Sequence, residues 1–261
     1  MMKISLRVKI ISLSIFLAFI ILGSFVFIFN NSRNTLDYQA NDNARNILNT
    51  ISVEMVNLLD IYKDELRILA RLSSVQDLVS ADMSVGSQED ISTKEDHQSH
   101  LKQVQNIFLT FVEENEDYMQ LRYIDRKGME VIRVDRSKKK NRVELRDQTD
   151  LSYKGDRYYF EETVGLDKGE VFVSPLDLNI ENGEIEIPYK PTIRLATPVF
   201  DNKGNNQGVI VINFFGSSLL DLVKKSPYQE TFLIDQDGYF LYDSQEADKE
   251  WGRYLGNEYK L

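Results

Sequence analysis

The sequence contains no cysteine, which excludes disulfide frameworks, zinc ribbons and thiol catalysis and leaves the redox state of its compartment open. It contains two histidines, His97 and His100, beside Glu95 and Asp96. Their spacing can present two metal ligands on one helical turn, but the surroundings are polar and no third ligand is apparent, so we predict no metal site. A glycine-rich phosphate loop, a G-x-S-x-G motif and an H-E-x-x-H motif are also absent. We therefore expect no catalytic residues and no cofactor in this chain.

Basic residues are fewer than acidic ones, 31 against 41 in 261 residues, for a net charge of −10. The first 29 residues carry positive charge alone, from Lys3, Arg7 and Lys9. The remainder therefore holds 28 basic and 41 acidic residues, a net charge of −13. A surface this acidic argues against nucleic acid as a partner.

One long apolar run stands near the N-terminus. Residues 10–29, IISLSIFLAFIILGSFVFIF, are 20 residues without a charge, the length that spans a hydrocarbon core of about 30 Å. A cleaved secretory signal is the alternative, but its apolar region is usually only about 7 to 15 residues long. We predict an uncleaved transmembrane helix. The positive-inside rule places residues 1–9 in the cytoplasm, so the chain would be a single-span protein of the inner membrane with its bulk periplasmic or extracellular.

Proline and glycine are both absent between Arg33 and Ser80. In this stretch apolar residues recur at intervals of three and four, which predicts one face of a long helix. The stripe consists of Leu48, Ile51, Met55, Leu58, Tyr62, Leu66 and Leu69. A helix leaving the membrane can be a stalk that pairs with a second copy of the chain in a homodimer, or it can simply cover one side of a sheet, and both can hold together. We assign residues 30–98 to this stalk and a polar loop from about residue 80, followed by a second helix over 99–114.

The same turn occurs three times in the second half of the chain. YIDRKGMEV, residues 123–131, returns as LIDQDGYFL, residues 233–241, and a related turn runs from Asp201 to Gly204. In each, Asp at the first position can bond its own backbone and Gly at the fourth tolerates a positive φ. The flanks are rich in β-formers, which indicates a repeated antiparallel-sheet module whose second copy is incomplete. We predict an α+β fold with a membrane-distal module over 99–228 and the start of a membrane-proximal module over 229–261.

Two charged segments lie among the predicted strands. RSKKKNR, residues 136–142, is typical of an exposed hairpin tip, though it can also draw an anionic partner. IENGEIE contains an Asn182-Gly183 hairpin turn and indicates a solvated face, with calcium as a minor alternative because the spacing matches no EF-hand loop.

Candidate ligand-binding residues cluster after residue 156. Arg157 offers a guanidinium fork for a carboxylate or phosphate, and Tyr158, Tyr159 and Phe160 follow it with rings that can exclude water. Asp177 can meet an ammonium or hydroxyl group. Further candidates on later predicted strands are Arg194 and Asn213. The alternative is that Tyr159 and Phe160 are core residues and that Arg157 pairs with an acid such as Glu161.

From residue 33 onward the chain resembles the double Cache family, the PAS-like extracytoplasmic sensors of bacterial membrane receptors, and most of all the sensor domains of histidine kinases. The block from Arg157 to Asp201 carries much of this resemblance. It implies the N-terminal part of a transmembrane sensor histidine kinase, with a diguanylate cyclase or a chemoreceptor as other outputs. A membrane-anchored extracytoplasmic enzyme or capture protein is the alternative from another class.

The resemblance also implies roles for particular residues. In amino-acid-sensing members, an arginine two residues before a tryptophan binds the ligand's carboxylate and two later acids bind its amine. Arg157 stands in the place of that arginine, Tyr159 replaces the tryptophan, Phe160 replaces the tyrosine that follows it, Asp177 fits the first acid and Asn213 falls where the second would be. The missing negative charge disfavours an α-amino acid and leaves a carboxylate or another small polar anion as the expected ligand.

Overall fold

Helix α1 (Leu6–Arg71) begins the computed structural model, which describes residues 6–82, 91–137, 142–181 and 183–261. The chain divides into two compact units, Met1–Val53 and Glu54–Leu261. Within the described residues, α1 is the one helix long and apolar enough to cross a membrane, as its uncharged run predicts. The helix continues without a break into the second unit, where its last turns join the core.

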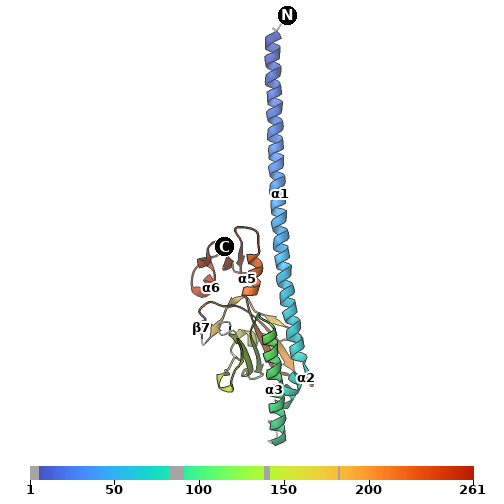
Figure 1. Cartoon of the computed structure of the whole chain (residues 1–261), viewed down its shortest axis with the longest axis vertical. Coiled ribbons are helices and arrows are strands. Elements are labelled where there is room, and N and C mark those ends of the chain that lie inside the picture. The colour runs from blue at the N-terminus through green and yellow to red at the C-terminus, as the bar shows by residue number, and fades with distance from the viewer. Residues whose placement is uncertain (1–5, 83–90, 138–141, 182) are drawn as a thin grey trace. The chain divides into compact units, whose positions relative to one another are not determined.

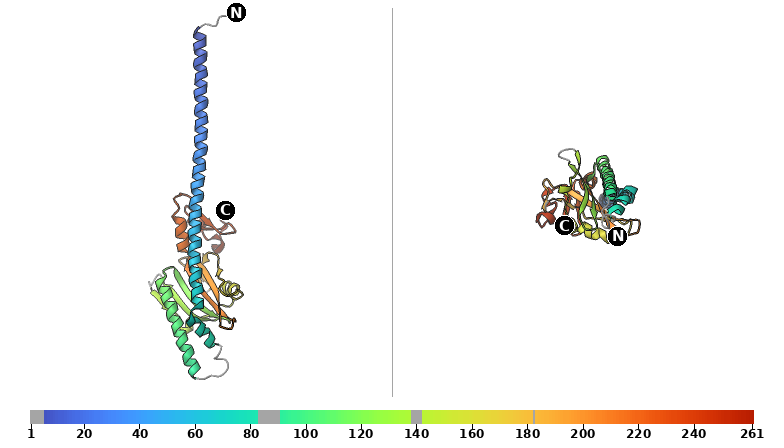
Figure 2. Two further views of the ribbon diagram at one scale, coloured as in Figure 1. Left: turned by 90° about the vertical axis from the view of Figure 1, so that its right-hand side faces the viewer. Right: turned by 90° about the horizontal axis from the view of Figure 1, so that it is seen from below.

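Three helices of the second unit pack together on one face of a sheet. They are the end of α1, α2 (Ser73–Asp82) and α3 (Ile91–Glu114), and Figures 1 and 2 show α3 beside the sheet. Of the predicted stripe, Tyr62, Leu66 and Leu69 are buried in this core and Leu58 packs against it, while Leu48 is exposed. The C-terminal half of the stripe therefore covers the sheet.

The predicted loop over 80–98 is partly wrong. Helix α2 extends to Asp82 and α3 begins at Ile91 rather than at 99, while residues 83–90 lie outside the described residues. Residues 91–98 contain no Gly or Pro and include Lys, Glu and Gln, which have good helix propensity. Their polarity suits an exposed helical turn as well as it suits a loop.

A seven-stranded antiparallel sheet forms the centre of the second unit, in the order β3-β2-β1-β9-β8-β4, with β5 also paired to β8. Its strands are β1 (Tyr118–Asp125), β2 (Glu130–Ser137), β3 (Arg142–Leu145), β4 (Phe172–Val173), β5 (Asp177–Leu178), β8 (Pro191–Phe200) and β9 (Asn206–Phe215). The long pair β8 and β9 coincides with the two runs predicted from β-formers. Strand β3 is an addition to the prediction.

Side-chain alternation gives the sheet two different faces. Leu121 and Tyr123 of β1 point into the core under α1, α2 and α3, together with Ile210, Ile212 and Leu195. The other face carries a smaller cluster around α4 (Tyr158–Val164), whose Tyr159 and Phe160 pack with Ile124, Ala196, Val209 and Val211. That face also carries the polar residues Gln120, Arg122, Arg194 and Asn213, which build the site described below.

The rest of the chain forms short elements. Strands β6 (Ile180–Glu181) and β7 (Glu184–Ile185) make a small hairpin at the predicted place, although Asn182 lies outside the described residues. After β9 come α5 (Ser217–Lys224), the hairpin β10 (Phe232–Ile234) with β11 (Phe240–Asp243), and α6 (Gly252–Leu255). Single 3-10 turns stand at Gln148–Asp150 and Ala247–Lys249.

All three Asp-x-x-Gly turns have the predicted geometry. The side chain of Asp125 accepts the backbone N–H groups of residues 127 and 129, and Asp201 and Asp235 repeat this pattern. The fourth-position glycines have φ values of 84°, 82° and 86°, the left-handed region that favours glycine. The repeat seen in the sequence is therefore a repeated hairpin turn in the structure.

Candidate ligand-binding site

A polar cavity of about 240 Å³ opens on the face of the sheet that carries α4. Its wall contains five cationic side chains and two carboxylates. The cationic residues are Arg122, Arg133, Lys154, Arg157 and Arg194, the acids are Asp150 and Glu181, and the wall also includes Gln120, Ser152, Tyr159, Asn179 and Asn213. The predominance of cations makes this a cavity for a small anion.

Strand register brings the floor of the cavity together. Gln120 of β1 is paired with Asn213 of β9, and Asn213 is paired with Arg194 of β8, so three polar residues form a row across three strands. Arg122 lies two residues along β1 and is paired with Arg133 of β2. Residues two apart on a strand share a face, so both rows point away from the helical core.

Arg122 is buried on this floor, with 3% of its surface exposed. Its Nη1 donates to the phenol oxygen of Tyr159 at 2.9 Å and its Nη2 donates to Oδ1 of Asn213 at 2.8 Å. The carboxylate of Glu130 lies 3.6 Å away and accepts the backbone N–H of Ser152 at 3.0 Å. The negative charge of the buried Glu130 thus balances the positive charge of Arg122.

Arg194 is likewise held by an ion pair and a hydrogen bond. Its Nη1 lies 2.5 Å from Oδ1 of Asp177 and donates to the phenol oxygen of Tyr158 at 3.2 Å. The Tyr158 hydroxyl donates to the second oxygen of Asp177 at 3.0 Å. Burial alone would lower the pKa of Arg194, but the charge of Asp177 outweighs it and the pKa is raised. Both arginines also lie near the ring of Tyr159, at 5.1 Å and 5.9 Å from its centroid.

Arg133, the third arginine on the floor of the cavity, forms a separate set of ion pairs. Its Nε lies 2.9 Å from Asp135, and its Nη2 lies 3.2 Å from Glu181 of the β6–β7 hairpin. Burial alone would raise the pKa of Asp135, but hydrogen bonds from Arg133 and Arg146 lower it below its usual value. Asp135 therefore remains ionised and balances the charge of Arg133.

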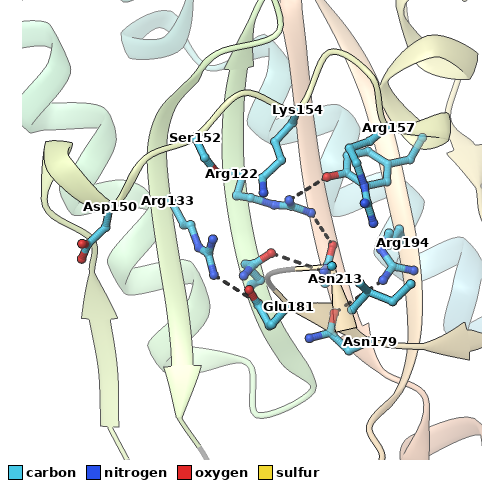
Figure 3. A pocket seen from close by; sticks show the side chains of 14 residues that line it. Arg122, Arg133, Asp150, Ser152, Lys154, Arg157, Asn179, Glu181, Arg194 and Asn213 are labelled. Carbon is cyan, nitrogen blue, oxygen red and sulfur yellow. Dashed lines mark hydrogen bonds and ion pairs between the residues drawn. The ribbon is translucent and has the colours of Figure 1, made fainter. Parts of the chain in front are cut away.

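Lys154 and Arg157 differ from these three residues. Both are half-buried, both extend into the cavity from the loop that precedes α4, and neither has an ion pair with any residue that the structure describes (Figure 3). The alternative pairing of Arg157 with Glu161 is not among the ion pairs of the described residues. Arg157 instead precedes α4 as its N-cap residue, and its carbonyl accepts the N–H groups of Phe160 and Glu161.

The structure brings the six predicted site residues into one region. Arg157, Tyr159, Arg194 and Asn213 line the cavity, whereas Tyr158 and Asp177 lie behind Arg194 and bind it. Tyr159 and Phe160 are at the same time core residues of α4, so both interpretations of these rings hold.

Sequence reasoning missed Lys154 and the floor residues Gln120, Arg122 and Arg133. Polar side chains at alternate positions of β1 and β2, inside runs of β-formers, are the signal that could have found three of them. Lys154 has no such signal, because it lies in a loop whose path depends on the backbone bond from its N–H to the carbonyl of Gly128, at 2.7 Å.

Metal ligation finds no support in this region. Among the described residues there is no group of three or more His, Asp or Glu side chains that could hold a metal ion. Glu130, Asp177 and Glu181 near the cavity each lie against an arginine.

Comparison with known proteins places this chain in a family. Residues 49–261 match the family model described as "Bacterial histidine kinase, sensor domain". No curated protein matches the chain.

Several solved structures share the fold. A domain of a sensory box/GGDEF family protein from Vibrio parahaemolyticus has a TM-score of 0.65 at 21% identity, covering 81% of this chain and 74% of that one. The extracellular domain of the histidine kinase vpHK1S-Z8 has a TM-score of 0.64 at 21% identity, with 81% and 70% covered. The sensor domain of the Vibrio cholerae histidine kinase DctB has a TM-score of 0.56 at 18% identity, with 81% and 69% covered.

These findings assign the chain in two steps. The α+β architecture, an antiparallel sheet with helices packed on it, is the fold of solved sensor domains such as the extracellular domain of a histidine kinase. The chain belongs to the bacterial histidine kinase sensor-domain family, and its function is that of the extracellular sensor domain of such a kinase.

Proposed function

We propose that the cavity is the sensing site and that its ligand is a small anion, such as a carboxylate. The observation that carries this proposal is the presence of two cations, Lys154 and Arg157, in the wall without an acidic partner among the described residues. Two uncompensated charges facing one half-buried space repel each other, and an anion between them removes that cost while gaining charge-assisted hydrogen bonds.

Three of the acids around the cavity support an anion over an amino acid. Asp177, Glu130 and Glu181 each already lie against an arginine, so they are poorly placed to receive an ammonium group. In this proposal Arg157 and Lys154 contact the ligand, Arg194 and Asn213 complete the wall, and Tyr158 with Asp177 holds Arg194 in position. The ring of Tyr159 keeps water from one side.

For the whole receptor, we infer that the parent is a protein histidine kinase anchored in the inner membrane by residues 10–29, with the sensor on the periplasmic side. The module over 99–228 would lie far from the membrane, and residues 229–261 would begin a second module nearer to it.

The helix α1 would pair with α1 of a second copy of the chain, since Ile61 and Ile68 expose 55% and 57% of their surface on a helix whose other side is buried. A diguanylate cyclase output is the second candidate, supported by the fold shared with the GGDEF protein.

A thermal-shift screen of the full chain in detergent micelles tests the anion site. Acetate, succinate and inorganic phosphate represent anions, and choline and glucose serve as a cation and a neutral solute. Saturation to about 100 times Kd adds roughly 2.7 kcal/mol to the stability of the folded state. We expect stabilisation by an anion and none by choline or glucose.

Arg157→Ala is the diagnostic variant and Arg126→Ala is its matched control, because Arg126 is an exposed arginine of the β1–β2 turn outside the cavity. Loss of a hydrogen bond to a charged group costs about 1.5 to 3 kcal/mol, so Arg157→Ala should weaken anion binding by roughly 10- to 100-fold. Equal shifts in both variants, or no shift with any anion in the wild-type chain, would reject the site.

A further inference from the structure

Strand β5 touches two different parts of the second unit with its two faces. Asp177 points to Arg194 at the cavity, while its neighbours Leu176 and Leu178 point the other way, as alternation along a strand requires. Leu178 is 1% exposed and belongs to a small core with Leu220, Leu241 and Trp251, against which Leu176 and Tyr254 also pack. One short strand thus joins the cavity to the C-terminal segment, residues 232–255.

The cavity side of β5 is tightly bonded. Asp177 and Arg194 are 2.5 Å apart and Tyr158 bonds both of them, so the three side chains form a closed cluster. The backbone adds to this connection, because Asp177 is paired with Thr192 of β8 and Ser174 exchanges bonds of 2.9 Å with the backbone of Arg194. A shift of the Arg194 guanidinium must therefore move β5 or break this cluster.

The other side of β5 has space to respond. A cavity of about 300 Å³ lies between Pro175 and Leu176 on one side and Leu241, Arg253 and Tyr254 on the other. This cleft is open to solvent, so the side chains on its two sides are not close-packed against one another and this contact can repack with little steric cost. The pKa of Tyr254 is raised, first by burial and then by the charge of Asp177, which places this tyrosine within electrostatic range of the cluster.

Trp251 shows that the C-terminal segment stores strain. Its φ is 62°, in the left-handed region, and it is the one non-glycine residue with a positive φ in the part of the chain that the structure describes. A bulky side chain adopts this conformation only where its surroundings enforce it. Here the backbone N–H of Trp251 donates to the carbonyl of Phe240 at 2.7 Å, and the indole is buried in the core that contains Leu178. A displacement of Leu178 within this core would remove part of what enforces it.

We propose that β5 is a coupling strand that transmits the state of the Arg194–Asp177–Tyr158 cluster to the C-terminal segment around Trp251. The ligand part of this inference rests on the proposed anion site. An anion in the cavity attracts Arg194 and competes with Asp177 for its donors, which loosens the cluster. Leu176 and Leu178 then shift against Leu241 and Trp251, and the strained backbone at Trp251 relaxes.

Trp251 is the only tryptophan in the sequence, so its fluorescence reports on this contact without a label. The test uses the full chain in detergent micelles and compares Asp177→Asn with Glu181→Gln. Both variants neutralise an acid paired with an arginine of the same cavity, but Glu181 lies on β6 and is absent from the core that contains Trp251. We expect a red shift of the Trp251 emission and stronger acrylamide quenching in Asp177→Asn, with wild-type values in Glu181→Gln.

Tyr158→Phe is a milder second variant that removes one hydroxyl from the cluster and leaves the ion pair, so it remains informative if Asp177→Asn does not fold. It should shift the emission in the same direction by a smaller amount. Unchanged Trp251 fluorescence in the folded Asp177 and Tyr158 variants would overturn the proposal. So would equal changes in Glu181→Gln, because they would mean general loosening.

Titration with succinate and inorganic phosphate separates this inference from the anion site. If an anion binds, it should change Trp251 emission in the wild-type chain and leave it unchanged in Asp177→Asn. Because the coupling is reciprocal, a substitution at Leu241 should in turn alter the affinity for the anion by about fivefold or more. Binding that leaves Trp251 emission unaltered in the wild-type chain would overturn the coupling. A response to Asp177→Asn without any anion binding supports the coupling strand and counts against the anion site.

Discussion

At the scale of single residues, several carboxylates of this domain act as internal acceptors. Asp201 is the clearest case outside the cavity, because it accepts backbone N–H groups from Lys203 at 2.8 Å and Asn205 at 2.9 Å and a side-chain bond from Gln207 at 2.9 Å. These bonds favour the ionised form, and the N–H of Asn205 is the largest cause of a pKa lowered to about 2. The turn between β8 and β9 therefore depends on a charge.

This shift predicts a pH dependence of stability. The pKa of Asp201 is lower in the folded chain than in the unfolded chain, so its contribution is fully present above the usual aspartate pKa of 3.8 and is lost as the pH falls towards about 2. Thermal unfolding between pH 5 and pH 2 should show a steeper loss of melting temperature in the wild-type chain than in Asp201→Asn. Asp77→Asn, at an exposed helical position, is the control and should follow the wild-type slope. Identical slopes for all three chains would contradict this origin.

The candidate site shows how far residue-level reasoning on the sequence extends. Arg157 was predicted because its guanidinium suits an anion and because it matches the arginine of a family pattern, while Arg194 and Asn213 were candidates as polar residues on later predicted strands; all three line one cavity. Arg122 was not predicted, since its place on the floor depends on pairing with strands that are up to 91 residues away in sequence, as its bond to Asn213 illustrates. Whether a charged side chain is free or internally balanced is likewise a property of register, which composition does not reveal.

At the scale of elements, the long strands and helices followed from local patterns, whereas the short ones depend on tertiary pairing. Strands β8 and β9 are ten residues each, rich in β-branched residues, and they are the flanks of the Asp201–Gly204 turn that the sequence predicts to be strands. Strand β5 has two residues and exists because Asp177 and Leu178 pair with β8. The basic segment 136–142 was predicted as a hairpin tip, and residues 138–141 lie outside the described residues. Its first residue, Arg136, bonds to a helix end instead.

Arg136 closes the C-terminal end of α3. Its Nη2 donates to the carbonyls of Glu113 at 3.1 Å and Asn115 at 3.2 Å, and also to that of Val112. These carbonyls have few partners at a helix end and carry the negative end of the helix dipole, so a guanidinium group there is stabilising.

Replacing Arg136 should therefore destabilise the fold. Because hydrogen bonds to charged groups contribute about 1.5 to 3 kcal/mol, Arg136→Ala should lower the free energy of unfolding by roughly that amount. Arg142→Ala removes a cation whose side chain is 59% exposed and should change it by less than about 0.5 kcal/mol. Urea unfolding of the two variants measures the difference, and equal losses would mean that Arg136 contributes only surface charge.

At the scale of the whole molecule, the face of α1 opposite the sheet has no partner among the described residues. Ile61 and Ile68 are seven residues apart, so they lie two turns apart on one side of the helix, and each is more than half exposed. Singly exposed apolar residues are ordinary, but two on one line of a helix that leads from a predicted membrane span are what a pair of stalks would bury. Proposed dimerisation and the burial of Tyr62, Leu66 and Leu69 against the sheet therefore use different sides of α1.

The absence of cysteine makes this pairing directly testable. Single substitutions Ile61→Cys and Ile68→Cys should form disulfide-linked dimers in membranes under mild oxidation, because equivalent positions on paired helices approach to the Cα separation of about 4.4 to 6.8 Å that a disulfide needs. Lys63→Cys is the matched control: two residues from Ile61, it lies on nearly the opposite side of the helix, where its side chain is 28% exposed. Cross-linking confined to positions 61 and 68 would establish the paired face. Equal cross-linking at all three positions would indicate random collision, and none at 61 and 68 would leave the sensor to signal through a single stalk.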